Sequence, residues 1–434
     1  MVVCCENLTL SLHDLIFPVT KKIHLCIKIT HFMNSRTSIA FAIIILCSFK
    51  MSAQQGVNEI SFGKGLLNYV AADSSFSVKF APRFQVRYYG TSDFSDDGLA
   101  PVDHDFLVRR SRFKFDGWVV HPSIGYKMEF GLSNNDMSGA NAFTKNSPRY
   151  ILDAVIKWKF APGFELWAGQ TKLPGNVERV ISSANLQLVD RSLLNSKFNI
   201  DRDLGIQLRH TTKLGGQFIS KEKFAISQGE GRNIATGNEG GLQYTGRVEL
   251  FPLGGFTKKG EYMGSSTVRE EKLKIMAAYT YDFNADASKT RSNMGDYMFL
   301  MDGSLHQTNI TTQFIDLVMK YEGFSLMAEY ADRSATNPIA VELDGTETGD
   351  IVTVGSAFNM AVGYFISEKI EVAGRYTTLN YADVTGTSPA TMYTLGLNKF
   401  VVGHKLKVQG DISYSTKNGE SDAIIFRTGF ELHF

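Results

Sequence analysis

The residues with the clearest chemical potential are arginines and lysines that recur at alternate positions in short apolar segments. Arg83 and Arg87 alternate with apolar residues in one segment, and Arg110, Arg112 and Lys114 do so in another. In an extended strand, this alternation places the cations on one face. Guanidinium groups offer several fixed N–H donors to an oxyanion, and rings of Arg or Lys form pores that select anions. These cations are therefore candidates for binding small anions.

A structural role for the same cations is an open alternative. A polar lumen carries many charges that pair across strands, and carboxylates are available for this at Asp116, Glu129, Asp153, Asp190 and Asp203. Charge pairing alone would keep such a lumen wet and rigid, and it would leave no free cation for a ligand.

The stretch Gly169–His210 interrupts the alternation for about thirty-five residues. It carries four further candidate anion-binding residues, Lys172, Arg179, Arg191 and Arg202, together with apolar residues that can be buried. A connection of this length needs a purpose, and its composition is typical neither of a linker nor of a disordered segment. We expect a loop folded into the lumen of a barrel, where it narrows the channel.

The elements that must position these residues are about sixteen short alternating segments. Examples are Phe76–Tyr88 and Leu152–Phe160, the latter followed by a tight turn and a second segment from Phe164. A soluble β-sandwich has the same periodicity, so the pattern alone does not decide which face is wet. The number of segments, a predicted signal peptide and the terminal Phe434 together favour an all-β fold, a transmembrane antiparallel β-barrel with about sixteen strands and an inward constriction loop.

The N-terminal region carries the marks of a secretory signal peptide. From Met33 the chain has a charged Arg36, an apolar core from Ile39 to Cys47 and a small-residue exit at Ala53. This core is too short for a membrane-spanning helix, and bulky Leu46 argues against lipoprotein cleavage at Cys47.

We therefore expect three regions. Residues 1–53 would contain the signal peptide, which starts at Met33, with residues 1–32 lying before the true start. Residues 54–74 would form an extended leader, and residues 75–434 the barrel. All four cysteines precede residue 48, which predicts no disulfide framework and no thiolate metal site in the mature chain. The formal net charge of the whole chain is +1, which argues against a nucleic-acid-binding protein.

Several motifs resemble those of one known family. They are GQ-x-K-x-P from Gly169, ER-x-x-SS from Glu178, L-x-x-x-DRS from Leu186, RD-x-GIQ from Arg202, the RRxR segment within Phe106–Gly117, and the terminal FRTGFELHF. Together they resemble the phosphate-selective porins of the O and P type.

The resemblance implies an outer-membrane porin of a Gram-negative bacterium, acting as a passive channel for small anions such as phosphate or polyphosphate. It also implies a homotrimer in contact with outer-membrane lipid, and no cofactor. Two other functions stay open: a general porin for other small polar solutes, and a non-transporting barrel that acts as an adhesin or assembly scaffold. An inward position of the loop Leu173–Asn199 would indicate a pore, and an outward position a binding surface.

An enzymatic function is not indicated. After residue 53 the histidines are His104, His121, His210, His306, His404 and His433. Only His104, between two aspartates, resembles a catalytic arrangement, and a solvated loop explains it as well. GxSxG, HExxH and glycine-rich phosphate-loop motifs do not occur. We expect neither catalytic residues nor a metal site.

Overall fold

The computed structural model describes residues 62–434. The predicted signal peptide, the start at Met33 and the first part of the predicted leader lie outside the described residues. None of the helices within residues 62–434 is both long and apolar enough to cross a membrane.

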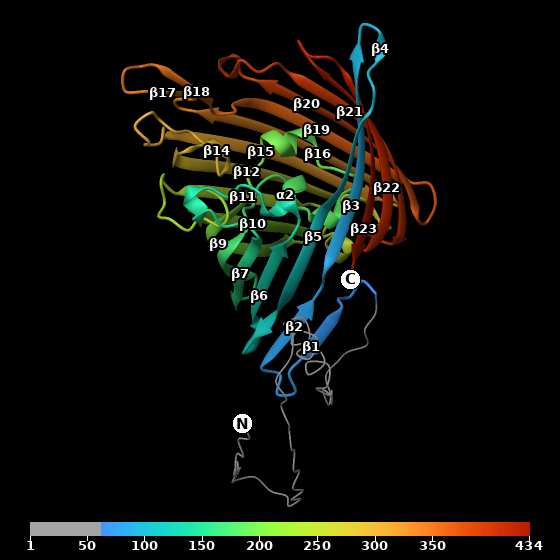
Figure 1. The fold of residues 1–434 in the computed structure, drawn as a ribbon. Helices are drawn as coiled ribbons and strands as arrows, with labels where there is room; N and C mark the ends of the chain where they lie inside the picture. The colour runs from blue at the N-terminus through green and yellow to red at the C-terminus, as the bar shows by residue number, and fades with distance from the viewer. Residues whose placement is uncertain (1–61) are drawn as a thin grey trace, which may run out of the picture. The chain divides into compact units, whose positions relative to one another are not determined.

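Sixteen antiparallel strands form a closed barrel, as the alternation predicts (Figure 1). The last strand pairs with the first, from His433 opposite Arg83 to Ala423 opposite Asp93, which closes the ring. In chain order the barrel strands are β3 (Arg83–Ser95), β5 (Asp103–Val119), β6 (His121–Gly131), β7 (Ile151–Ala161), β8 (Phe164–Lys172), β9 (Arg202–Gly215), β10 (Phe218–Ser227), β11 (Gln243–Phe251), β12 (Lys274–Ala287), β15 (Thr308–Tyr321), β16 (Phe324–Ala335), β19 (Gly355–Phe365), β20 (Ile370–Tyr381), β21 (Ala390–Val402), β22 (Leu406–Lys417) and β23 (Ala423–His433).

Shorter elements lie at the strand ends and in the connections. The strands are β1 (Leu67–Val70), β2 (Phe76–Phe80), β4 (Gly98–Leu99), β13 (Lys289–Arg291), β14 (Met294–Tyr297), β17 (Ile339–Val341) and β18 (Glu347–Ile351). The helical turns are α2 (Asn134–Met137), η1 (Ala142–Thr144), α3 (Val177–Val180), η2 (Ser183–Asn185), α4 (Leu193–Lys197), η3 (Thr257–Tyr262) and η4 (Asp383–Thr385).

The side chains of β3 face the two sides of the wall as predicted. Arg83 and Arg87 are buried in the lumen, whereas Phe84 and Val86 are 43% and 39% exposed on the outer surface. A soluble sandwich would bury its apolar face, so the outward apolar face identifies a wall made for lipid. The other strands repeat the pattern, with Trp158 of β7 exposed on the outside.

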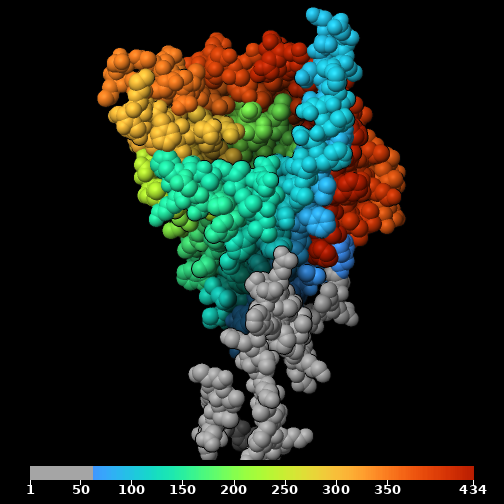
Figure 2. Space-filling model, in the orientation of Figure 1, coloured from blue at the N-terminus to red at the C-terminus, as the bar shows by residue number. Residues whose placement is uncertain are grey.

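Part of the predicted leader is a strand. β1 pairs with β2, and β2 continues the pairing of the wall along the end of β5, with Phe76 opposite Val119. Pro82 separates β2 from β3, and a proline has no N–H to donate to a strand neighbour. At the other end of these strands, the β3–β5 hairpin stands above the neighbouring wall (Figure 2).

The core of the molecule lies inside the barrel, between the loop and one side of the wall. In one cluster Leu194 and Phe198 of the loop pack against Phe314 of β15. In a second cluster Val177 of the loop packs with Phe251 of β11. Burial of these side chains, worth about 1.5–3 kcal/mol each, holds the loop in the lumen. The predicted inward loop is therefore confirmed.

Candidate functional site

The lumen contains a cavity of about 810 Å³, which lies between the loop and the part of the wall formed mainly by β5 to β9. Fifteen arginines and lysines line it, but only five carboxylates do, which gives the lining an excess of ten positive charges. The five acidic residues are Glu129, Asp136, Asp153, Asp190 and Asp201. An excess of this size attracts anions into a confined space.

A β-bulge in β5 brings two consecutive arginines to this cavity. Gln85 of β3 lies opposite Arg110, and the next residue, Val86, lies opposite Val108, so that Arg109 is the extra residue. A bulge shifts the alternation by one position. Arg109 and Arg110 therefore both line the cavity, whereas Val108 is exposed on the outer surface.

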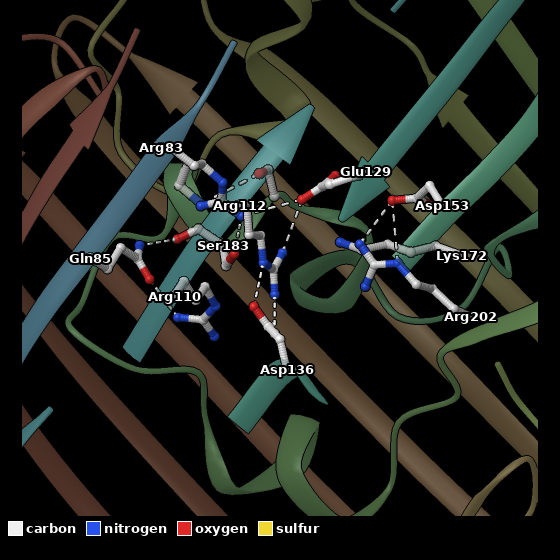
Figure 3. A network of polar contacts seen from close by, with 12 residues as sticks. Arg83, Gln85, Arg110, Arg112, Glu129, Asp136, Asp153, Lys172, Ser183 and Arg202 are labelled. Carbon is white, nitrogen blue, oxygen red and sulfur yellow. Dashed lines mark hydrogen bonds and ion pairs between the residues drawn. The ribbon is translucent and has the colours of Figure 1, made fainter. Parts of the chain in front are cut away.

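Arg112 is held by two carboxylates (Figure 3). Its Nε and Nη2 donate to the two carboxylate oxygens of Asp136 at 2.8 and 2.7 Å, and its Nη1 donates to Glu129 at 3.1 Å. Burial raises the pKa of Asp136, but the hydrogen bonds from Arg112 outweigh this effect and lower the pKa to about 2. Arg83 similarly pairs with Glu431 at 3.4 Å. These guanidinium charges are neutralised within the wall.

The next group of ion pairs lies in the loop and in the strands beside it. Arg202 pairs with Asp153 at 3.1 Å, and Arg179 pairs with Asp201 within the loop connection. Arg87 pairs with Asp190. Burial raises the pKa of Asp190, but the charge of Arg87 outweighs it and keeps that pKa below its ordinary value.

Three predicted cations have no carboxylate within 4 Å among residues 62–434: Arg110, Lys172 and Arg191. Arg110 donates to Gln85 Oε1 at 2.6 Å, and its buried Nε has no partner within this part of the chain. Lys172 donates to loop carbonyls at 2.6–3.2 Å, and Arg191 donates to the carbonyls of Glu178 and Ile181 at 3.2 and 2.9 Å. Burial lowers the pKa of Arg191; the charge of Glu178 raises it, and nearby arginines lower it further. An anion would relieve this repulsion.

The opposite wall uses its cations to hold the backbone of the loop. Arg333 of β16 donates to the carbonyls of Phe198 and Asn199 at 2.8 and 3.0 Å. Arg375 of β20 donates to the carbonyl of Asp190 at 2.7 Å. Charged groups bonded to carbonyls contribute about 1.5–3 kcal/mol each, so the constriction is rigid.

The predicted site residues therefore divide into two sets. Those that line the cavity are Arg110, Arg112, Lys172, Arg179, Arg191 and Arg202. Arg83, Arg87 and Lys114 are not among its lining residues. Lys114 instead pairs with Asp116 at 2.6 Å.

Sequence reasoning missed seven lining cations: Arg109, Lys127, Arg149, Lys223, Arg232, Arg291 and Arg427. Arg149 and Arg232 lie in connections outside the alternating segments, and Arg109 is the bulge residue. No periodic signal marks these three positions, whereas Lys127, Lys223 and Arg427 lie within barrel strands. The only sequence signal for Arg109 is its place in the RRxR segment, directly before Arg110.

No metal-binding arrangement of side chains occurs in the part of the chain that the structure describes. No group of three or more His, Cys, Asp or Glu residues there is placed to hold a metal ion. His104 Nδ1 lies 2.7 Å from the hydroxyl of Tyr88, on an exposed hairpin. This agrees with the solvated-loop interpretation of His104.

Comparison with known proteins gives one sequence match and several matches in fold. The family model described as phosphate-selective porin O and P matches residues 78–424. No curated protein sequence matches the chain.

Three solved porin structures are similar in fold. The anion-selective porin from Comamonas acidovorans is 11% identical, with 83% of this chain and 100% of that chain covered and a TM-score of 0.50. The outer membrane channel DcaP of Acinetobacter baumannii is 12% identical, with 84% and 99% covered and a TM-score of 0.50. OmpF of Salmonella typhi, in complex with daunomycin, is 10% identical, with 84% and 99% covered and a TM-score of 0.51. At these identities the likeness is one of fold alone.

Proposed function

Because this chain belongs to the phosphate-selective porin O and P family, we propose that it is a passive channel through which small anions cross the outer membrane of a Gram-negative bacterium. The family and the closed barrel make it an outer-membrane porin. The preference for anions is the proposed part. The observation that carries it is the excess of ten positive charges around the cavity.

The contacts of individual residues support this preference. Arg110, Lys172 and Arg191 direct their charge into the cavity without a carboxylate partner in the described chain. Arg112, Arg179 and Arg202 line the same cavity beside their carboxylates and add donors more than net charge. Arg83 pairs with Glu431 of the wall, Arg87 pairs with Asp190 of the loop, and Lys114 pairs with Asp116 within β5.

Phosphate or polyphosphate is the proposed solute. A tetrahedral oxyanion has several acceptor oxygens, and a cavity with many N–H donors can replace part of its hydration. Because conduction requires weak binding at several places, spread-out cations suit a channel better than one tight site. A general porin for small polar solutes is the alternative, and it would show no preference between chloride and potassium.

The test is the reversal potential of the purified protein in a planar bilayer with a KCl gradient. We expect the sign of an anion-selective pore, and a reduction of the chloride current when millimolar phosphate is added. Cation selectivity would contradict the anion channel. Equal permeation of both ions would favour a general porin, and no conductance would favour an adhesin or scaffold.

We also propose that three chains associate as a homotrimer. β6, β7 and β8 have 11, 11 and 9 residues, and β10 and β11 are as short, with 10 and 9. The run β6–β8 adjoins β5, whose Phe106 is 79% exposed, so a second subunit can cover this part of the wall. Crosslinking in native membranes should give trimers, and monomers alone would contradict the proposal.

The predicted processing also belongs to the proposal. We propose that the chain starts at Met33 and that the mature protein begins at Gln54, with the barrel from residue 75. N-terminal sequencing of protein from the outer-membrane fraction tests both points. An acylated Cys47, or protein found in the periplasm, would contradict them.

A further inference from the structure

Trp167 of β8 lies between two cations from the neighbouring strands. Lys157 Nζ of β7 is 3.9 Å from the centre of the indole, and Arg209 Cζ of β9 is 3.6 Å from it. In the wall, Lys157 lies opposite Trp167, and Arg209 lies opposite Glu165, two residues away. All three side chains that form this group line the cavity.

Hydrogen bonds fix the geometry of this Trp167 group. The indole N–H donates to Glu165 Oε2 at 2.9 Å. Arg209 donates through Nε and Nη2 to Gln207 Oε1 at 3.3 and 2.7 Å. Gln207 in turn donates to the carbonyl of Lys172 at 2.9 Å, where the constriction loop begins. The group therefore lies next to the constriction, toward the β7–β8 turn.

The chemistry of this group differs from that of the constriction. Neither Lys157 nor Arg209 has a carboxylate within 4 Å in the described chain, so both charges are available to an anion. However, two nitrogens of Arg209 are already bonded to Gln207, and the surface between the cations is a partly exposed indole. The group thus offers two cationic charges next to apolar surface.

This combination suits a different ligand from a tetrahedral oxyanion. Phosphate is strongly hydrated and has no apolar surface to bury against an indole. A short-chain carboxylate has one anionic end for a cation and an alkyl end that leaves water favourably. The contact is strongest when charge and apolar surface lie within one small molecule's length of each other, as they do around Trp167.

We propose that Lys157, Trp167 and Arg209 form a subsite for small organic carboxylates, so that the channel carries organic acid anions as well as inorganic ones. The carboxylate lies against Lys157 or Arg209, and the alkyl group lies against the part of the indole that these two cations leave uncovered. This inference rests on the proposed anion channel and adds a second class of solute to it.

The experiment compares how acetate and butyrate block the chloride current through single channels. Butyrate has two more methylenes than acetate. If each is half buried, the two together contribute as much as one buried methylene, which corresponds to about four-fold stronger block. In the Trp167→Ala variant, acetate and butyrate should block the chloride current equally. In the Trp167→Phe variant, part of the preference for butyrate should remain. Block by phosphate should be the same in all three proteins.

Charge variants test the cations separately. Lys157→Gln and Arg209→Gln should weaken block by both acids while keeping the preference for butyrate. Lys213→Gln removes an exposed charge from β9 outside the cavity lining and should change nothing. Heat-modifiable migration in gels shows for every variant that the barrel has folded.

A direct measurement uses Trp167 as its own probe. The chain has three tryptophans, so the double variant Trp118→Phe and Trp158→Phe leaves Trp167 alone. Its fluorescence should be quenched by 2-bromobutyrate at lower concentrations than by bromide.

Equal block by acetate and butyrate in the unmodified protein, or an unchanged preference in Trp167→Ala, would overturn the subsite. Equal quenching by 2-bromobutyrate and bromide would also overturn it. An anion-selective reversal potential in the same channels would show that the anion channel itself still holds.

Discussion

Replacing Arg110 with glutamine should weaken the anion preference of the pore without affecting folding. Arg110 lines the cavity, and its only side-chain hydrogen bond within residues 62–434 goes to Gln85 Oε1. A glutamine amide can donate to the same oxygen. Because no carboxylate loses its partner, the change should remove a charge and little else.

The size of the effect follows from Coulomb's law. An anion about 5 Å from the guanidinium gains about 0.8 kcal/mol in a water-filled pore, and a cation loses the same amount. At 0.1 M salt, where the Debye length is about 10 Å, screening reduces each effect from about four-fold to about two-fold, so the ratio of chloride to potassium permeability should fall roughly five-fold. The charge excess of the lining falls only from ten to nine, so the channel should remain anion-selective.

The assay is the reversal potential of Arg110→Gln in a KCl gradient, beside the unmodified protein. Lys369→Gln is the matched control, because Lys369 is an exposed charge between β19 and β20 and does not line the cavity. The ratio should change for Arg110 and not for Lys369. An unchanged ratio in Arg110→Gln would refute the reasoning and would make the bond to Gln85 the role of that arginine.

Three further variants test the neighbouring charges. Arg112→Gln leaves Asp136 without its guanidinium and Glu129 with only Arg83 and Lys127, so we expect a loss of about 3 kcal/mol, seen as a lower urea midpoint; an unchanged midpoint would contradict the ion-pair assignment. The pKa of Asp136, about 2, lies below its unfolded value, so the roughly 2 kcal/mol that this carboxylate contributes is present above about pH 4 and lost as pH falls through about 2. Asp136→Asn should therefore flatten the stability curve between these pH values, and an unaltered curve would count against it. Asp190→Asn removes one of the five carboxylates of the lining, so it should raise the chloride-to-potassium permeability ratio, opposite to Arg110→Gln, in the same bilayer assay; a fall in the ratio would disprove this assignment.

Much of the fold follows from local patterns that the sequence displays. Alternation has a period of two residues, so it predicts which side chains of a strand share a face, as for Arg83 and Phe84. The count of such segments predicted sixteen strands. The length, arginines and apolar residues of the stretch after Lys172 predicted that it folds inward, because only a partner wall can bury those apolar groups.

The partners of the cations could not be predicted in the same way. Asp116 and Asp190 are plausible partners for Arg110 and Arg112 by sequence, yet neither pairs with them. Arg112 is neutralised by Asp136 from α2 and by Glu129 of β6, and Arg110 binds the uncharged Gln85. Such pairs depend on strand register and on how a connection folds over the lumen, and neither has a periodic signal.

The sequence by itself determined that this protein has a barrel wall with a cationic inner face, because that property depends only on residue order along each strand. Tertiary structure decided which charges remain available to a solute. The decisive contacts are between residues far apart in the chain. Examples are the β3–β5 pairing that makes Arg109 a bulge residue, the bond from Arg232 to the carbonyl of Asp136, and the bonds from Arg333 to the loop. Net charge in a lumen is a sum over such neighbours, so it exists only once the barrel has closed around its loop.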